Sequence, residues 1–351
     1  MSLPKFHITI GTEEKQQLSR NIWSREFVKA SLSDGRSAIP IQIRYRGGHT
    51  REYAKKSYEI RLQGKTYHLN AEYDDPSLIR NALSFRYFQM IGVPSPHTRH
   101  IVIWINGRNE GIYLLIEAVK RSFFRRRGII ARSLMYASND RAGFSPTDPE
   151  TGKPKRSLFE GYNLIKGSAE DRTRLELFIR SLNTFKGERL QRLLTKQMDV
   201  NNYLRWLAGA VMTGNYDGFE HNYAIYEHKA TRRYRMIPWD YEGTWGRNCY
   251  GKRVDSDLVR ITGYNTLTRK LLSYPAIRKQ YKTVLSNLLE TSFTTDAIMP
   301  IVHRLHSRLI PDIYEDRSRK WPISVFESEP GIIKKYIEDR RKDMKEGIRS
   351  L

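Results

Sequence analysis

The chain has a single cysteine, Cys249, among its 351 residues, which excludes an internal disulfide and a metal cage built from cysteines. It contains no apolar run of about 18 residues, so we predict no transmembrane helix. Residues 1–10 mix polar and apolar side chains and lack the hydrophobic core of a signal peptide. The nine histidines are scattered without i, i+4 pairs, which disfavours a zinc site. Together these absences predict a protein that stays inside the cell that makes it.

Acidic residues are in deficit. The 61 lysines and arginines face only 38 acidic residues, for a net charge of +23. The basic residues cluster at Lys120–Arg127, Lys153–Arg156, Arg232–Arg235 and Arg317–Lys320. Any single cluster is what a solvated surface also shows, but the total favours an anionic partner or ligand. No recognition helix or stacking motif supports nucleic acid, and a nucleoside triphosphate would itself be such a ligand.

The first third of the chain alternates apolar and polar residues, which is typical of strands with one buried face. The alternating positions are Phe6, Ile8 and Ile10, then Ile39, Ile41, Ile43 and Tyr45, then Tyr58, Ile60 and Leu62. A helix follows, because Asp75 can cap it and Gly92 can end it. The pair Asn106-Gly107 predicts a hairpin between His100–Ile105 and Ile112–Ile116.

Helical periodicity dominates the rest of the chain after a polar loop over Ser138–Leu158. Asp199 can cap one helix, and Ile332–Ile348 has the pattern of a final amphipathic helix. Further apolar positions at helical spacing are Leu175, Phe178, Ile179 and Leu182, and then Leu267, Leu271 and Leu272. We therefore predict an α+β fold with a β-rich lobe over residues 1–118 and a larger, mainly helical lobe over residues 119–351.

Asp217, Asn222 and Asp240 form the most informative constellation. Tyr223–Glu227 and Tyr234–Trp239 suit two short antiparallel strands. With the apex near Thr231, Asn222 and Asp240 are expected to lie opposite each other, about 5 Å apart. One carboxylate and one amide oxygen would then face a common point, and hard oxygen ligands suit Mg²⁺.

Asp217 precedes this pair by one tight loop, where its carboxylate could accept a hydroxyl proton. A base, an asparagine five residues later and a hairpin that ends in a metal-binding aspartate is the order found in protein kinases. The usual His-Arg before the base is replaced by Asn215-Tyr216. The spacing alone also fits a turn aspartate beside Gly218 and a strand-entry asparagine, and the hairpin favours the first interpretation.

The β-rich lobe offers cationic groups for phosphates. Gly47 and Gly48 would let backbone N–H groups approach phosphate oxygens, with Arg46 beside them, although an ordinary glycine turn fits equally well. Alternation places Lys56 on the inward face with Tyr58, where a phosphate could pair with it. Snorkelling at a strand end is the alternative for Lys56. Lys55 is expected on the wetter face.

A carboxylate that orients the lysine is expected at Glu117 or Glu72, because the helix over Leu78–Ile91 contains no glutamate. Glu117 has a second candidate role. The segment from Glu117 to Val119 lies at the junction of the two predicted lobes, where backbone groups could bond an adenine edge.

These residues together resemble the spore coat protein H kinase family, and the resemblance extends over most of the chain. The segments that carry it run from Arg46-Gly47 to Lys55-Lys56-Ser57-Tyr58, from Asn215-Tyr216-Asp217 to His221-Asn222-Tyr223, and from Pro238-Trp239-Asp240 to Gly246, with Leu69–Tyr73 and Asn265–Thr268. Three features depart from the expected pattern, one of which is the missing glutamate in the helix over Leu78–Ile91. Glu242 stands where many members carry Asp, and the glycine loop is short.

The resemblance implies an atypical protein kinase with a two-lobed, kinase-like fold that uses ATP and Mg²⁺ or Mn²⁺. It implies phosphorylation of serines in other spore coat proteins, in support of outer coat assembly and germination, by a protein made in the mother cell and located in the spore coat. By position, Asp217 would be the catalytic carboxylate, Asp240 would hold the metal with support from Asn222, and Lys56 would contact phosphates. The alternative is a catalytically inactive, nucleotide-binding scaffold of the coat.

Overall fold

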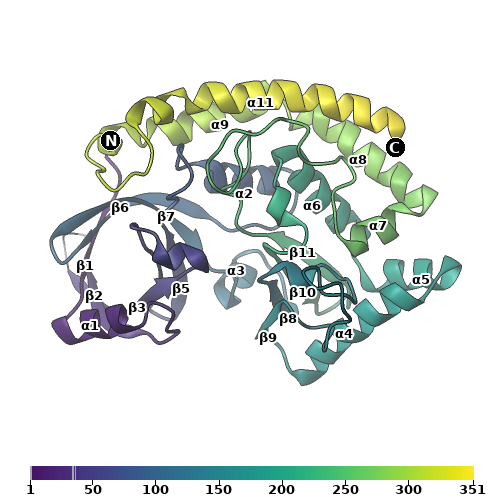
Figure 1. The fold of residues 1–351 in the computed structure, drawn as a ribbon, viewed down its shortest axis with the longest axis horizontal. Coiled ribbons are helices and arrows are strands. Elements are labelled where there is room, and N and C mark those ends of the chain that lie inside the picture. The colour runs from purple at the N-terminus through teal and green to yellow at the C-terminus, as the bar shows by residue number, and fades with distance from the viewer. Residues whose placement is uncertain (1, 34, 36) are drawn as a thin grey trace. The chain divides into compact units, whose positions relative to one another are not determined.

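The computed structural model describes residues 2–33, 35 and 37–351, and the chain divides into two compact units. Unit 1 comprises residues 1–83, 96–123 and 300–331. Unit 2 comprises residues 84–95, 124–299 and 332–351. Helices α2 (Arg80–Met90), α3 (Arg121–Arg126), α9 (Thr295–Ser307) and α11 (Ile323–Ser350) contribute residues to both units. The elements are labelled in Figure 1.

Unit 1 is built on a closed seven-stranded barrel with the strand order β1-β2-β3-β4-β5-β7-β6. Strands β1 and β6 pair in parallel and close the barrel, while the other neighbours are antiparallel. Its strands are β1 (Lys5–Thr9), β2 (Val28–Ser33), β3 (Ala38–Arg46), β4 (Ser57–Leu62), β5 (Lys65–Asn70), β6 (Thr98–Ile105) and β7 (Arg108–Glu117). The remaining short elements of unit 1 are α1 (Thr12–Arg20), η1 (His49–Glu52) and α10 (Ile310–Ile313).

The alternating residues of the sequence fill the barrel. Ile8, Ile43, Ile60 and Tyr113 are buried in one hydrophobic cluster with other inward-facing strand residues. Burial of apolar side chains contributes about 25 cal/mol per Å², so this interior is the main source of stability of the barrel. The hairpin predicted at Asn106-Gly107 is confirmed, since strands β6 and β7 pair on either side of it.

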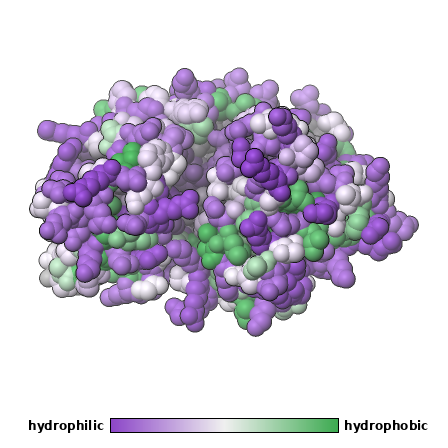
Figure 2. All heavy atoms as spheres, turned by 60° about the horizontal axis from the view of Figure 1, so that its bottom comes forward, coloured by the Kyte–Doolittle hydropathy of each residue, from purple (hydrophilic) through white to green (hydrophobic). Residues whose placement is uncertain are grey.

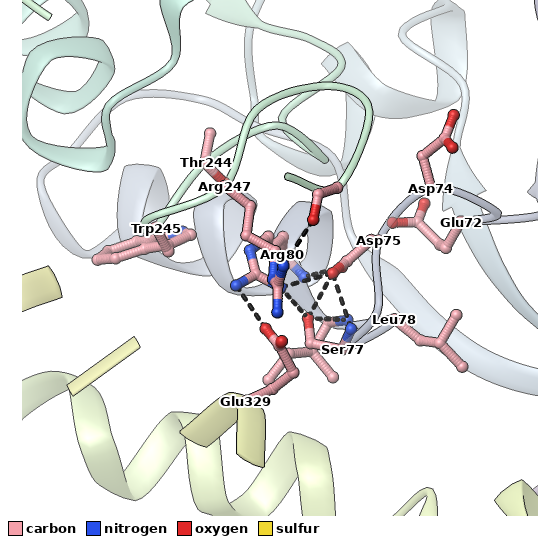
Figure 3. Close-up of polar contacts among 12 residues, drawn as sticks. Glu72, Asp74, Asp75, Ser77, Leu78, Arg80, Thr244, Trp245, Arg247 and Glu329 are labelled. Carbon is pink, nitrogen blue, oxygen red and sulfur yellow. Dashed lines mark hydrogen bonds and ion pairs between the residues drawn. The ribbon is translucent and has the colours of Figure 1, made fainter. Parts of the chain in front are cut away.

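The C-terminal part of unit 1 is tied to the start of α2 by buried charges (Figure 3). Arg80 is fully buried, and its Nη1 lies 2.7 Å from Asp75 Oδ1 while its Nη2 lies 2.6 Å from Glu329 Oε2. The Asp75 side chain also accepts the backbone N–H groups of Ser77 and Arg80. Asp75 therefore caps the start of α2, as predicted, and holds the guanidinium that reaches Glu329.

Unit 2 contains a four-stranded antiparallel sheet with the order β11-β10-β8-β9. Its strands are β8 (Ala131–Ala137), β9 (Tyr162–Lys166), β10 (Tyr223–His228) and β11 (Tyr234–Pro238). Its helical elements are η2 (Asp140–Ala142), α4 (Ala169–Thr184), α5 (Gly187–Gln197), α6 (Val200–Thr213), η3 (Tyr216–Gly218), α7 (Thr266–Leu272) and α8 (Pro275–Thr291). The mixture of barrel, sheet and helices confirms the predicted α+β class.

Helix α6 is the central helix of unit 2. Asp199 caps it by accepting the N–H of Asn202, as predicted, and every residue from Trp206 to Thr213 is buried. Gly214 ends the helix at a φ of 72°, a left-handed conformation that glycine adopts without strain. The chain thus leaves α6 sharply and enters the segment that carries Asp217.

The two-lobe division at residue 118 stays a prediction. None of the helices in the described part of the chain is both long and apolar enough to cross a membrane. The face drawn in Figure 2 is mostly hydrophilic, with scattered hydrophobic residues, as expected for a strongly charged chain.

Candidate active site

The hairpin of β10 and β11 has a register one residue away from the predicted one. Tyr223 pairs with Pro238, and the backbone N–H of Trp239 donates to Asn222 O at 3.1 Å. Asn222 therefore lies opposite Trp239, and the prediction that it lies opposite Asp240 is wrong. The turn explains the difference, because the N–H of His228 bonds Arg233 O at 2.9 Å and centres the hairpin between residues 230 and 231.

Asn222 and Asp240 nevertheless share an unusual backbone. Their φ angles are 59° and 58°, in the left-handed region that non-glycine residues seldom adopt, although Asn and Asp tolerate it best. Such a conformation costs about 1 kcal/mol or more and is found preferentially at functional sites. Because neither residue has a β conformation, the alternation of side chains along a strand does not set their directions. A prediction based on that alternation therefore cannot place the two side chains.

Asn215 connects the Asp217 loop to the end of the hairpin. Its side chain is buried, and its Nδ2 donates to Asp240 O at 3.4 Å. Gly218 packs on the same side chain, since a Cβ there would lie 2.7 Å from Asn215 Nδ2. The half-buried Asp217 lies in the η3 turn between these two residues. One side-chain hydrogen bond from Asn215 to Asp240 O and one main-chain hydrogen bond from Trp239 to Asn222 O thus join the segments of Asp217, Asn222 and Asp240.

Cys249 is a neighbour of Asp217 that sequence reasoning missed. Burial raises the pKa of its thiol to about 12, assisted by the negative charges of Asp217 and Glu242 and by a hydrogen bond to Asp217. The loop after Asp240 brings Cys249 there, because Gly243 packs against the Cys249 backbone, where a Cβ would lie 2.5 Å from its nitrogen. The glycine at position 243 is the only sequence signal for this close approach.

The donors present fit a hard divalent cation that completes its shell elsewhere. Among the residues that the structure describes, no group of three or more His, Cys, Asp or Glu side chains is arranged to hold a metal ion. Asp240 and Asn222 offer one carboxylate and one amide oxygen. Mg²⁺ is usually bound by one or two carboxylates together with phosphate and water oxygens, so this donor set suits a metal that arrives with a nucleotide.

In unit 1 the two adjacent lysines exchange the predicted positions. Lys55 is buried, and its Nζ donates to Ile112 O at 2.7 Å and lies 3.4 Å from Asp316 Oδ2. Lys56 is half-exposed, with its Nζ donating to Arg51 O at 2.6 Å. The prediction that Lys56 faces inward and Lys55 outward is wrong, because β4 begins only at Ser57 and the bend before it breaks the alternation.

The carboxylate beside the buried Lys55 is Asp316. It is neither of the two predicted candidates, Glu117 and Glu72. Burial lowers the pKa of Lys55, while Asp316 raises it, followed more weakly by Glu72. Glu72 itself is buried and accepts hydrogen bonds from Asn70 and Asn81. No sequence signal links Lys55 to a residue 261 positions later, because the contact depends on the return of the chain to unit 1.

The Gly47-Gly48 segment forms a compact turn at the end of β3. Gly47 has a φ of +118°, and a Cβ there would lie 2.2 Å from Thr50 Oγ1, so only glycine fits. Arg51 Nε donates to Gly47 O at 2.8 Å, which closes the turn. Burial is the main cause of a lowered pKa of Arg51. The positive charges of Arg44, Arg25 and the half-exposed Arg46 lower it further. A phosphate role for Arg46, Gly47 and Gly48 stays a prediction.

Glu117 and Val119 are both buried at the end of β7. The Glu117 carboxylate accepts the backbone N–H of His97 at 3.3 Å, and the Glu117 N–H donates to His97 O at 2.9 Å. The backbone N–H of Glu117 is therefore already hydrogen-bonded. A role for the backbone of Glu117 and Val119 in binding an adenine edge stays a prediction.

Asp217 also lines an open groove of about 810 Å³ that lies within unit 2. The groove is lined by acidic residues and by two arginines. The lining residues that bear on its chemistry are Asp140, Asp217, Glu220, His221, Arg260 and Arg269, with the rings of Tyr216 and Tyr264. A volume of this size is within the range of ligand-binding sites, so the candidate base faces a space that can hold an acceptor.

Glu220 is the most perturbed acid of the groove. Burial raises its pKa to about 7, while Lys155 opposes the rise and Asp140 adds to it. The carboxylate fits because residue 143 is glycine, where a Cβ would overlap Glu220 Oε2. Sequence reasoning did not single out Glu220.

Comparison with known proteins decides the family. Residues 43–344 match the family model described as CotH kinase protein. The chain is 38% identical over 354 aligned residues to the inner spore coat protein H of Bacillus subtilis, covering 99% of this chain and 98% of that protein. The chain belongs to the CotH kinase protein family. The resemblance seen in the sequence is thereby confirmed.

Other similar proteins are more distant. A second Bacillus subtilis protein, inner spore coat protein H-like protein, is 29% identical and covers 93% of this CotH family chain and 94% of its own length. Among solved structures, the proinflammatory kinase CtkA of Helicobacter pylori aligns at 9% identity and a TM-score of 0.34, covering 84% of this chain and 93% of its own. HipA, in its complex with HipB and operator DNA from Shewanella oneidensis MR-1, aligns at 12% identity and a TM-score of 0.41. The alignment covers 100% of this chain and 76% of that one.

Proposed function

We propose that this member of the CotH kinase family is an ATP-dependent protein kinase that phosphorylates serines of spore coat proteins. The observation that carries the proposal is the joining of the Asp217, Asn222 and Asp240 segments by the Asn215 side chain and by a main-chain hydrogen bond, with Asp217 also facing a groove. Family membership and the 38% identity to inner spore coat protein H support it. Outer coat assembly and germination are the processes that the activity would serve.

In this proposal Asp217 accepts or orients the proton of the acceptor hydroxyl, because a half-buried carboxylate beside a solvent-accessible groove can reach an incoming serine. Asn222 and Asp240 would hold Mg²⁺ or Mn²⁺. The cation supplies charge neutralisation for the phosphates when it is bound. The Cys249 thiol donates a hydrogen bond to Asp217 and so restrains the carboxylate in the absence of a substrate.

Lys56 would contact the phosphates. Lys56 uses one of its three N–H donors on Arg51 O, which leaves two donors for phosphate oxygens. Arg46 and the backbone of Gly47 and Gly48 would add to this. Backbone groups of Glu117 and Val119 would bond the adenine edge.

Transfer of labelled phosphate from ATP to a serine-containing coat protein tests the proposal. Removal of a general base costs roughly 10²–10⁴-fold in rate, so Asp217→Asn should lose about that much while its circular dichroism spectrum is unchanged. Asp255→Asn, at an exposed carboxylate outside the groove, is the matched control and should keep its activity. Transfer by Asp217→Asn at the wild-type rate would remove Asp217 from the mechanism.

The alternative function is a scaffold of the spore coat that binds nucleotide without turnover. The scaffold would have the same nucleotide site as the kinase but would not transfer phosphate. Wild-type protein that binds ATP with a divalent cation, yet transfers no phosphate to any coat protein, would establish the scaffold in place of the kinase.

A further inference from the structure

The charged residues that line the groove beside Asp217 differ in whether they have a neighbour of opposite charge. His221 Nδ1 lies 2.5 Å from Asp140 Oδ1, and Glu220 lies in the electrostatic field of Lys155. Asp140 and Glu220 thus each have a basic residue as a neighbour within unit 2.

The two arginines of the groove lining lack such a neighbour. Arg260 and Arg269 are exposed, both line the groove, and neither forms an ion pair with a residue in the described part of the chain. Arg260 is held in place by its Cζ lying 4.4 Å from the centre of the Tyr264 ring. A guanidinium stacked on an aromatic ring keeps its N–H donors directed outward, and those donors match the oxygens of phosphate and carboxylate.

Ring contacts limit how far Arg260 lies from Tyr216, the residue before the candidate base. The Tyr264 ring centre is 5.4 Å from that of Tyr216, and Tyr216 directly precedes Asp217. The Arg260 guanidinium therefore lies within roughly 10 Å of the Tyr216 ring, a distance that an extended peptide spans in about three residues. One peptide could thus contact both Arg260 and Tyr216.

We propose that Arg260 and Arg269 form an anion-binding subsite that takes a phosphorylated or acidic side chain of the same polypeptide whose serine is presented to Asp217. This inference rests on the proposed kinase function. It makes the groove selective for acceptors that carry negative charge two to four residues from the serine. If the charge is a phosphate, one modified serine favours modification of the next, and clustered serines become phosphorylated in succession.

Three acceptor peptides of one sequence test the subsite. They carry phosphoserine, glutamate or glutamine at a position three residues from the acceptor serine, and kcat/KM is measured for each. We expect the phosphoserine peptide to exceed the glutamine peptide by about tenfold, as for one or two charge-assisted hydrogen bonds. If the glutamate peptide equals the phosphoserine peptide, the subsite takes anions in general and not phosphate in particular.

Substitutions assign the effect to the groove. In Arg260→Ala and Arg269→Ala the ratio of phosphoserine to glutamine kcat/KM should fall towards one. Lysine in place of either arginine should restore part of it. Lys270→Ala, at a neighbouring cation outside the groove lining, is the matched control and should keep the wild-type ratio. A wild-type ratio near one, or a ratio that survives both arginine substitutions, would overturn the proposal.

Binding without turnover separates this proposal from the kinase function. The fluorescently labelled phosphoserine peptide is titrated with Asp217→Asn protein, with and without Arg260→Ala, and fluorescence anisotropy gives Kd. Binding that needs Arg260 but no transfer in the wild type would refute the kinase and keep the anion subsite. Transfer in the wild type with binding that ignores Arg260 would keep the kinase and refute the subsite.

Discussion

Replacing Arg80 by alanine should lower the free energy of unfolding by about 3–5 kcal/mol, because breaking a buried ion pair leaves an uncompensated buried charge. The structure makes this a severe case. Arg80, Asp75 and Glu329 all have side chains with 0% exposure. Truncation removes the contacts of 2.7 Å to Asp75 Oδ1 and 2.6 Å to Glu329 Oε2. It also removes a 2.9 Å hydrogen bond to Ser77 Oγ.

The matched control is an ion pair of the same length at the surface. Lys335 Nζ lies 2.7 Å from Asp339 Oδ2, with side-chain exposures of 77% and 32%. Exposed pairs contribute little because water screens them, so Lys335→Ala should leave the stability almost unchanged.

Urea unfolding, followed by both circular dichroism and tryptophan fluorescence, measures the two effects. The double variant Arg80→Met, Glu329→Leu should recover part of the loss, because it replaces two of the buried charges with apolar groups. The reasoning is refuted if Arg80→Ala costs no more than Lys335→Ala.

Three further outcomes follow from the site. Burial raises the pKa of Glu220 to about 7, above its unfolded value near 4.3, so stability present at low pH is lost as pH rises through 7. Glu220→Gln should flatten the pH dependence of urea unfolding between pH 5 and 8 by about 1–3 kcal/mol, and an unchanged slope would contradict this. Because the pKa of Cys249 is raised to about 12, its thiol should react with Ellman's reagent at pH 8 at least about tenfold more slowly than in urea; equal rates would show that the thiol is ionised. Asn222→Ala should cost about 1 kcal/mol more than Asn222→Gly, since glycine tolerates a φ of 59°, while both should weaken metal-dependent ATP binding measured by calorimetry.

Local pattern predicted much of the fold. The barrel strands show period-two alternation, the Asn106-Gly107 turn has the φ values of 48° and 82° that this dipeptide favours, and Asp75 and Asp199 cap the helices they precede. These features depend on a few neighbouring residues, which is why the sequence alone reveals them.

The errors arose where backbone geometry departs from the regular pattern or where distant segments meet. The β10–β11 register shifted by one residue because the turn at residues 228–233 determines it. The final helix begins at Ile323 rather than Ile332 and contains Pro330 within it, although proline usually breaks a helix. The partner of Lys55 lies in a segment, residues 300–331, that returns to unit 1, and Cys249 reaches Asp217 through an irregular loop.

A crystal grown with Mn²⁺ and a non-hydrolysable ATP analogue tests the central claim, that Asn222 and Asp240 hold the cation beside Asp217. The account predicts an anomalous peak within about 2.2 Å of both the Asp240 carboxylate and the Asn222 amide oxygen, with the terminal phosphate as a further ligand. A nucleotide bound with its cation on other residues, and no peak between Asn222 and Asp240, would contradict it.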